Sequence, residues 1–197
     1  MIRRARADEV DAAAYTHLMN EAGDDIFRLV FGPDWMRPLS EAYLVKEHVL
    51  SYQYVWFAER DGLVVGMVMC FSAEALKISK NPGVTWATGL RLLRLCGWLL
   101  AMWPLVRFMG KVPDGDYYVQ GLAVEPSARG GSIGSLLLNH TEVQARKRGS
   151  RRLALDVAVE NEGAQRLYAR RGMREEGRSP QFFGIPRVIR VVKELDD

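Results

Sequence analysis

One glycine-rich turn constrains the fold of this chain more than any other segment does. Residues 122–134 read Leu-Ala-Val-Glu-Pro-Ser-Ala-Arg-Gly-Gly-Ser-Ile-Gly. An apolar run thus leads through small residues into a helix expected from Ile133 to about Arg148. Small residues let a ligand approach the backbone, and a helix start presents unpaired N–H groups at the positive end of its dipole. The segment is therefore typical of a diphosphate site, or of a plain strand-to-helix turn that needs glycine for its dihedral angles.

A second segment carries a similar junction between a strand and a helix. A strand is expected from Leu153 to Val159, followed by a helix from about Gly163 to Arg171 with Gly172 after its end. Asn161, at the junction, can cap the helix or bond a ligand amide. Tyr168 can place a phenol at the mouth of the strand pair, and it is equally readable as a half-buried aromatic residue.

Together the two segments resemble the GNAT superfamily of acyl-CoA-dependent N-acyltransferases. The first is similar to the family's acyl-CoA loop, usually Val-x-Pro-x-x-Arg-Gly-x-Gly-x-Gly or Ala, in these residues: Val124, Pro126, Arg129, Gly130, Ile133 and Gly134. Ser132 stands where the middle glycine is most common. The second is similar to Asn-x-x-Ala-x-x-Leu-Tyr-x-x-x-Gly-Phe, with Met173 in place of the aromatic residue and these matches: Asn161, Ala164, Leu167, Tyr168 and Gly172. Two motifs in the family's order are more specific than either one alone.

The resemblance implies a fold, a co-substrate and a reaction. The fold is an α/β fold with a central mixed, mostly antiparallel sheet that is splayed between the fourth and fifth strands and has helices on both faces. The co-substrate is acetyl-CoA or another acyl-CoA. Its acetyl or similar short acyl group passes to a primary amine by direct attack in a ternary complex. The implied catalytic residue is Tyr168, which protonates the leaving thiolate as a general acid.

The residues expected to bind the cofactor follow from the same resemblance. Backbone groups of Leu122 and Val124 would pair with pantetheine and polarise the thioester carbonyl, and amides from Arg129 to Gly134 would hold the diphosphate. A serine at position 132 still supplies its N–H, although it carries strain if the position requires a positive φ. The complete expected set is Leu122, Ala123, Val124, Arg129, Gly130, Gly131, Ser132, Ile133, Gly134, Ser135, Asn161 and Tyr168.

Turn residues and periodicity place the remaining elements. The dipeptide Asp61-Gly62 predicts a hairpin, while Asp8 and Ser40 predict helix N-caps. The alternation of strands and helices predicts a mixed sheet with helices on both faces, and a helical insertion is expected at about residues 74–115. The other elements are expected at Ile2–Ala5, Asp8–Glu21, Ser40–Leu50, Tyr54–Glu59, Leu63–Phe71, Tyr117–Val124 and Val188–Glu194.

Composition limits the class of protein. The chain has 197 residues, of which 48% are hydrophobic, so we expect a single domain over residues 1–197 with a core of its own. A net charge of +3 is too small to indicate nucleic acid as a partner. Cys70 and Cys96 lie in segments expected to be buried. We therefore expect no disulfide framework and a cytoplasmic, reducing location.

The helical insertion leaves several interpretations open. Arg91, Arg94 and Arg107 with Pro104 argue against a membrane span from Trp86 to Gly110, because such a span would bury charge. The segment can lie on a membrane surface, pack on the core, form a homodimer interface or wall the acceptor pocket. The aromatic residues considered for that pocket are Trp86, Trp98, Trp103, Phe108, Phe182 and Phe183.

The acceptor and the general base are the parts of the reaction that the residues do not identify. A small-molecule or peptide amine is expected as acceptor. Asp156 and Glu160 are candidate bases, and each is also readable as a structural or solvent-facing carboxylate. The basic run at residues 146–152 either attracts the cofactor's phosphates or is a solvated helix end. The histidines lack metal-ligand spacing, so no metal is expected. The alternative function is a non-catalytic acyl-CoA sensor on the same fold.

Overall fold

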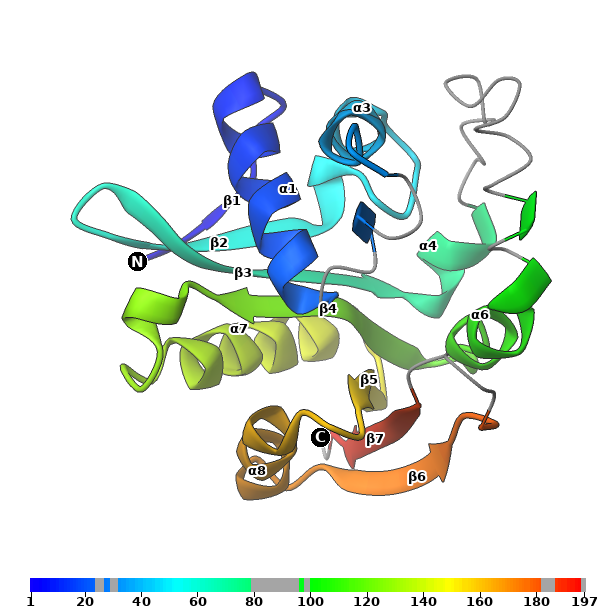
Figure 1. Ribbon diagram of the computed structural model, residues 1–197. Helices are drawn as coiled ribbons and strands as arrows, with labels where there is room; N and C mark the ends of the chain where they lie inside the picture. Colours follow the sequence, from blue (N-terminus) through cyan, green and yellow to red (C-terminus); the bar gives the residue numbers. More distant parts are fainter. Residues whose placement is uncertain (24–26, 29–31, 79–95, 98–99, 182–186, 196–197) are drawn as a thin grey trace.

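A single mixed sheet forms the centre of the molecule. The computed structural model describes residues 1–23, 27–28, 32–78, 96–97, 100–181 and 187–195. Its seven strands lie in the order β1-β2-β3-β4-β5-β7-β6 (Figure 1). Each neighbouring pair is antiparallel except β4 and β5, which are parallel. The strands are β1 (Ile2–Arg4), β2 (Val55–Arg60), β3 (Leu63–Ser72), β4 (Asp116–Val124), β5 (Arg152–Ala158), β6 (Arg174–Arg178) and β7 (Val188–Glu194).

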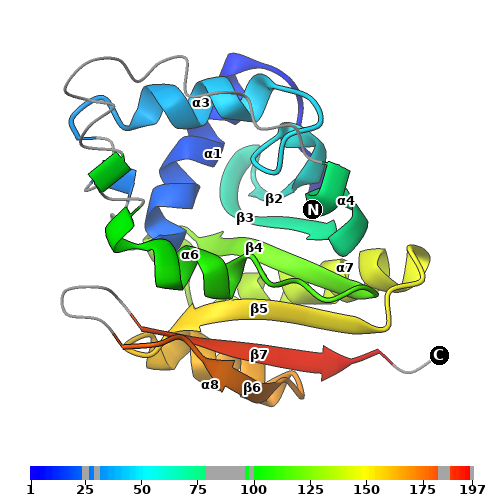
Figure 2. The same ribbon diagram turned by 90° about the vertical axis from the view of Figure 1, so that its right-hand side faces the viewer.

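Helices cover both faces of this sheet, which confirms the predicted arrangement. Figures 1 and 2 show α1 and α3 on one face and α7 on the other. One buried cluster packs Leu137 and Leu138 of α7 against the strands, and a second packs Tyr15 of α1 and Tyr43 of α3 against the opposite face. The helices are α1 (Glu9–Ala22), α3 (Met36–Leu44), α4 (Ala73–Ile78), α6 (Trp103–Met109), α7 (Ile133–Lys147) and α8 (Glu162–Arg170), with short 3-10 turns at Tyr52–Tyr54 and Pro126–Ala128.

Local turn and cap predictions are confirmed where the residue type determines the backbone. Asp61 and Gly62 join β2 to β3 with φ angles of 52° and 78°, the positive values that a type I′ hairpin turn requires. Asp8 caps α1, because its carboxylate accepts a hydrogen bond from the Asp11 amide at 2.8 Å. Gly172 follows α8 with a φ of 78°, the left-handed conformation that ends many helices.

The sheet opens between β4 and β5, as the family resemblance implies. These strands pair only from Asp116 to Val119 on β4 and from Arg152 to Leu155 on β5. Beyond that point β4 continues to Val124 and β5 to Ala158 without pairing to each other. The two free strand ends therefore form a fork whose apex lies at Val119 and Leu155.

Two expectations from the sequence are wrong. The helix expected to begin at Ser40 begins at Met36 and ends at Leu44, so Ser40 lies inside it. Pro38 fits the first turn of this helix, where the backbone N–H groups have no helical acceptor and a proline costs no hydrogen bond. Cys96, expected to be buried, is exposed, whereas Cys70 is buried as expected.

One strand was not predicted, and the insertion is only partly described. The sequence of β6 is Arg-Glu-Glu-Gly-Arg. It lacks the apolar alternation of a half-buried strand, and it pairs only with β7 at the edge of the sheet.

In the expected insertion, α4 and α6 are helical as predicted. Residues 79–95, 98–99 and 182–186 lie outside the described residues, and with them Trp86, Trp98, Phe182 and Phe183.

Candidate active site

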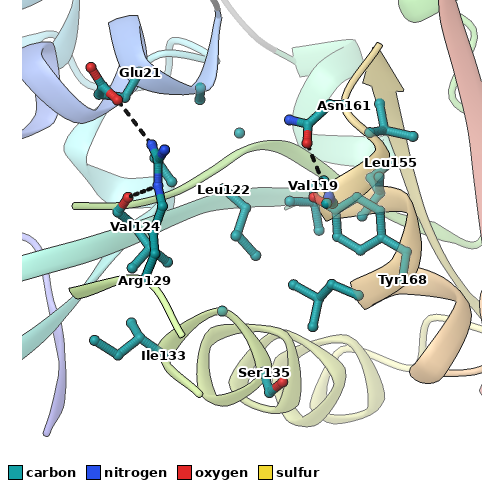
Figure 3. Close-up of a pocket in the computed structure, with 18 of the residues that line it drawn as sticks. Glu21, Val119, Leu122, Val124, Arg129, Ile133, Ser135, Leu155, Asn161 and Tyr168 are labelled. Atoms are coloured by element: carbon teal, nitrogen blue, oxygen red, sulfur yellow. Dashed lines mark hydrogen bonds and ion pairs between the residues drawn. The ribbon is translucent and has the colours of Figure 1, made fainter. Parts of the chain in front are cut away.

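The fork between β4 and β5 contains a cavity of about 750 Å³ (Figure 3). Its walls come from the end of α1, the free ends of β4 and β5, the start of α7, and α8. Gly131 is not among its lining residues, and a Cβ added there would lie 3.1 Å from Nη2 of Arg60. All the other residues expected to bind the cofactor line it: Leu122, Ala123, Val124, Arg129, Gly130, Ser132, Ile133, Gly134, Ser135, Asn161 and Tyr168.

The free edge of β4 offers backbone hydrogen-bonding groups to the cavity. The Glu125 amide donates to the Val65 carbonyl of β3 at 3.0 Å. Because successive residues of a strand point their N–H and C=O groups to opposite sides, Leu122 and Val124 direct theirs toward the fork. The Val124 carbonyl already accepts a hydrogen bond from Nε of Arg129 at 3.1 Å. Leu122 is thus the residue whose backbone is best placed to pair with an extended ligand.

The start of α7 has the features of an anion site. Ser132 is its N-cap residue, and its side chain makes no capping hydrogen bond. The Leu136 amide donates to the Ser132 carbonyl at 3.0 Å, so helix geometry leaves the amides of Ile133, Gly134 and Ser135 without a helical acceptor. These three residues line the cavity. Their unpaired amides lie at the positive end of the helix dipole, an arrangement that suits a diphosphate.

Ser132 has the positive φ that makes a serine strained. Its φ and ψ are 64° and 6°, in the left-handed region that costs an L-residue about 1–2 kcal/mol. We expect Ser132→Gly to raise the free energy of unfolding by about 0.5–1 kcal/mol, since glycine removes this cost but loses more backbone entropy on folding. Denaturant unfolding would measure the change. Ser132→Ala keeps the left-handed backbone strain and removes only the hydroxyl. If the glycine variant were less stable than the alanine variant, the proposed backbone strain at residue 132 would be contradicted.

Asn161 caps α8, which confirms one of its two interpretations. Its Oδ1 accepts a hydrogen bond from the Ala164 amide at 3.0 Å. In Figure 3 its oxygen points to this helix start, and its amide nitrogen is turned away from it. Nearby, Nε2 of Gln165 donates to the carbonyls of Ala158 and Val159 at 3.1 and 2.7 Å. The junction is therefore fixed by side chains, and within the described residues no hydrogen bond occupies the Asn161 amide nitrogen.

Tyr168 brings a buried phenol to the apex of the fork. The residue is 6% exposed and belongs to the same apolar cluster as Val119 and Leu155, beside which its ring lies in Figure 3. The hydroxyl makes no hydrogen bond to any residue in the described part of the chain. Burial raises the pKa of Tyr168 to about 12, so the phenol keeps its proton at neutral pH.

Asp156 lines the cavity as a fully paired carboxylate. It directly follows Leu155, the last residue of β5 that pairs with β4, and its side chain is 1% exposed. It accepts hydrogen bonds from the Tyr118 hydroxyl at 2.7 Å and from Nε and Nη2 of Arg190 at 2.9 and 2.8 Å. Burial, with the adjacent Asp156 carboxylate, raises the pKa of Tyr118 well above its ordinary value. These contacts support the structural interpretation of Asp156 over that of a free base.

The other charged candidates lie elsewhere. Glu160 is exposed and does not line the cavity. None of residues 146–152 lines it, because this basic run begins in the last turn of α7, at the opposite end of the helix from the cavity. Arg152 instead pairs with Asp116 and Glu176. The structure thus favours the solvated or structural interpretation of these charges.

Two lining charges were missed by the sequence reasoning. Glu21 of α1 pairs with Arg129 across the cavity at 3.0 Å (Figure 3). The two residues are 108 positions apart, so neither motif could indicate this contact. Arg170 also lines the cavity, from the last turn of α8. It lies inside the second motif at a position that the motif leaves open, and its charge was the available signal.

The described ranges contain neither a metal-binding cluster nor a membrane-spanning helix. Among these residues, no group of three or more histidine, cysteine, aspartate or glutamate side chains is arranged to hold a metal ion. No helix within the same ranges combines the length and the apolarity needed to cross a membrane.

The sequence is similar to known acetyltransferases. Residues 19–173 match the model of the acetyltransferase (GNAT) family. A protein of Bacillus subtilis (strain 168), provisionally named a ribosomal protein bS18-alanine N-acetyltransferase, is 32% identical over 68 residues, which cover 34% of this chain and 45% of that protein. An uncharacterized N-acetyltransferase of Methanocaldococcus jannaschii is 41% identical over 58 residues, covering 29% of this chain and 26% of that one. The aligned part thus spans less than half of the length of each of these curated relatives.

The fold is similar to that of a solved N-acetyltransferase. The crystal structure of the N-acetyltransferase from Staphylococcus aureus Mu50 superposes with a TM-score of 0.67 at 19% identity, covering 98% of this chain and 100% of that one. The matched family model spans both motifs, the fork and the start of α7. On this evidence the chain belongs to the GNAT family of N-acetyltransferases.

Proposed function

We propose that this protein transfers an acetyl group, or a similar short acyl group, from acyl-CoA to a primary amine by direct attack in a ternary complex. The observation that carries the proposal is the cavity in the fork. Unpaired amides of α7, a free edge of β4 and the protonated phenol of Tyr168 all meet there. Each of these features suits a different part of one ligand.

The residues present fit an acyl-CoA. The amides of Ile133 to Ser135 would hold its diphosphate, with the guanidinium of Arg170 as a further positive charge on the wall. From Val124 to Val119 the strand rises about 17 Å at roughly 3.3 Å per residue, which gives an extended amide chain room to lie along the edge. A Cβ added to Gly134 would lie 3.0 Å from Cδ2 of Leu167, so the gap between α7 and α8 depends on this glycine.

When bound, acyl-CoA supplies a thioester, whose carbonyl carbon is open to attack by an amine. The backbone of Leu122 would hold the chain and polarise the carbonyl, and positioning of the amine would supply most of the rate. As the new C–N bond forms and the C–S bond breaks, Tyr168 gives its proton to the sulfur. The phenol recovers a proton through solvent from the nitrogen that has become an amide. The products are an N-acyl amide and a thiol.

We further propose the N-terminal amine of a protein as acceptor. The support is the relative from Bacillus subtilis, whose provisional name gives an alanine of ribosomal protein bS18 as its substrate. A small-molecule amine is the competing acceptor.

One observation favours a non-catalytic acyl-CoA binder as the second candidate. Both cavity-lining carboxylates are held in ion pairs, Glu21 by Arg129 at 3.0 Å and Asp156 by Arg190 at 2.8 Å. Neither is then a free base in the described part of the chain. An ordered water would then have to take the proton from the attacking amine.

Titration and turnover measured together separate these candidates. We expect the protein to bind acetyl-CoA with a micromolar Kd in a calorimetric titration, because the cavity provides both anion contacts and a strand edge. Thiol release would then be followed with a peptide that begins with alanine, a lysine peptide, a polyamine and a free amino acid. Release with the alanine peptide supports the proposed acceptor. Binding without release to any amine would support the sensor, and no binding of acetyl-CoA or longer acyl-CoAs would refute both.

A further inference from the structure

Arg190 links the apex of the fork to the end of α6. It lies on β7 directly opposite Asp156 of β5 in the strand register. Its guanidinium donates to both carboxylate oxygens of Asp156, at 2.9 and 2.8 Å. The same group donates to the carbonyls of Phe108 and Met109 at 3.2 and 3.1 Å, and to the carbonyl of Lys111. One buried side chain therefore holds a cavity-lining carboxylate and the carbonyl end of a helix.

Two aromatic rings lie close to this guanidinium. Its central carbon lies 5.1 Å from the ring centre of Phe108 and 5.5 Å from that of Tyr118. The side chain is 7% exposed, and that of Asp156 is 1% exposed. A planar fork of donors that binds a carboxylate at two points is a geometry that arginine provides and lysine does not. The contact is thus specific to arginine.

The link lies on the face of the sheet that α7 leaves free. Tyr118 packs in a cluster with Phe71 and Ala154, whereas its neighbour Tyr117 packs in the cluster of α7. Successive strand residues point to opposite faces, so Tyr118 and the neighbouring Arg190 lie opposite α7. The hydrogen bonds of Arg190 to the carbonyls of Phe108 and Met109 place the end of α6 on this same face. The end of α6 is therefore held beside the apex of the fork, away from the anion site.

We propose that Arg190 is a positioning residue for the acceptor amine. This inference rests on the proposed function, in which the start of α7 and Tyr168 of α8 occupy the cofactor's side of the fork. The amine then approaches the apex from the opposite face, where Asp156 lines the cavity. Arg190 builds that approach by holding the Asp156 carboxylate in place and by fixing α6 as its wall.

Arg190→Met, Arg190→Lys and a matched control test this assignment. The control is Arg152→Met, because Arg152 of β5 holds Asp116 of β4 through Nε and Nη2 at 2.8 and 2.9 Å, in the same two-point geometry. That pair lies at the closed end of the fork and does not line the cavity. Both methionine variants thus lose an inter-strand arginine, but only one loses the link to α6.

Two measurements distinguish the contact between Arg190 and α6 from the effect of that contact on acceptor binding. Hydrogen exchange of residues 103–112 is expected to be about tenfold faster in Arg190→Met and unchanged in Arg152→Met, because only the former frees the carbonyls of α6. With an alanine-initiated peptide as acceptor, Arg190→Met is expected to raise the peptide KM about tenfold, with a smaller change in kcat. The Kd for acetyl-CoA should stay within about twofold of the wild-type value, and Arg190→Lys should be intermediate.

Each arm has a result that overturns the inference. Equal exchange in Arg190→Met and Arg152→Met would show that Arg190 does not hold α6. Faster exchange with an unchanged peptide KM would show that the link has no role in acceptor binding. If the wild-type protein binds acetyl-CoA but acetylates no amine, the proposed function fails and takes the acceptor role of Arg190 with it. The exchange measurement would then report on the link alone.

Discussion

Replacing Tyr168 with phenylalanine is expected to lower kcat for acetyl transfer about 100-fold, with the Kd for acetyl-CoA within about twofold of the wild-type value. The substitution removes one hydroxyl from a buried side chain that lines the cavity. Because this hydroxyl bonds no residue in the described ranges, its loss leaves no protein group unpaired. The leaving thiolate, in contrast, loses its proton donor. Steady-state thiol release and calorimetric titration would measure the two quantities.

The pH dependence of the wild-type protein tests the same role. Since burial raises the pKa of Tyr168 to about 12, the phenol holds its proton at neutral pH and loses it only as the pH approaches that value. We therefore expect titration of Tyr168 to cause no decline of kcat between about pH 7 and pH 10. A decline in this interval that Tyr168→Phe abolishes would contradict the raised pKa.

Tyr117→Phe is the matched control for Tyr168→Phe. Tyr117 is also a buried tyrosine, but its hydroxyl lies 3.6 Å from Sγ of Cys70 and does not reach the cavity. Its loss is expected to change kcat by less than about twofold. If Tyr168→Phe were as silent as this control in an active protein, the general-acid assignment would be wrong. If the wild-type protein itself released no thiol, the result would favour a non-catalytic acyl-CoA sensor over an enzyme.

The parts of the structure that sequence reasoning predicted are set by neighbouring residues. Asp61-Gly62 determines a hairpin because few residue pairs accept two positive φ angles, and Asp8 caps α1 through an amide three residues away. The residues of the two motifs that line the cavity could be predicted for the same reason. Each is a continuous segment in which a strand end, a turn and a helix start follow one another.

What the sequence did not reveal depends on contacts between distant segments. The sequence makes Asp156 a candidate base. The register of β5 and β7, however, places Arg190 opposite it, 34 residues away along the chain. Glu21 lines the cavity because its helix, α1, packs on β4. The packing is close there, since a Cβ added to Gly121 would lie 3.1 Å from the sulfur of Met19. The edge strand β6 has no apolar pattern of its own, since only β7 defines it. Such contacts have no local signature in a single sequence.

Replacing Gly134 with tryptophan is expected to raise the Kd for acetyl-CoA at least about 100-fold while the protein stays folded. A Cβ on this residue would lie 3.0 Å from Cδ2 of Leu167 and 3.9 Å from Cγ2 of Val124, so an indole would enter the gap between α7 and α8. That gap lies beside the amides expected to hold the diphosphate. The fold should tolerate the change, because the nearest atom ends a flexible side chain and tryptophan favours a helix more than glycine does. Calorimetric titration and the thermal unfolding midpoint would measure binding and stability.

The position of the cofactor is tested by comparing this variant with two others. Gly134→Ala adds only the Cβ and is expected to weaken binding less than Gly134→Trp, because the Leu167 side chain can shift to accept it. Leu136→Trp places the same indole on the same helix, but Leu136 is 46% exposed and does not line the cavity. Its Kd should remain within about twofold of the wild-type value. If Gly134→Trp and Leu136→Trp bound acetyl-CoA equally well, the cofactor would have to bind outside the fork, and Leu122, Asn161 and Tyr168 would lose their proposed roles together.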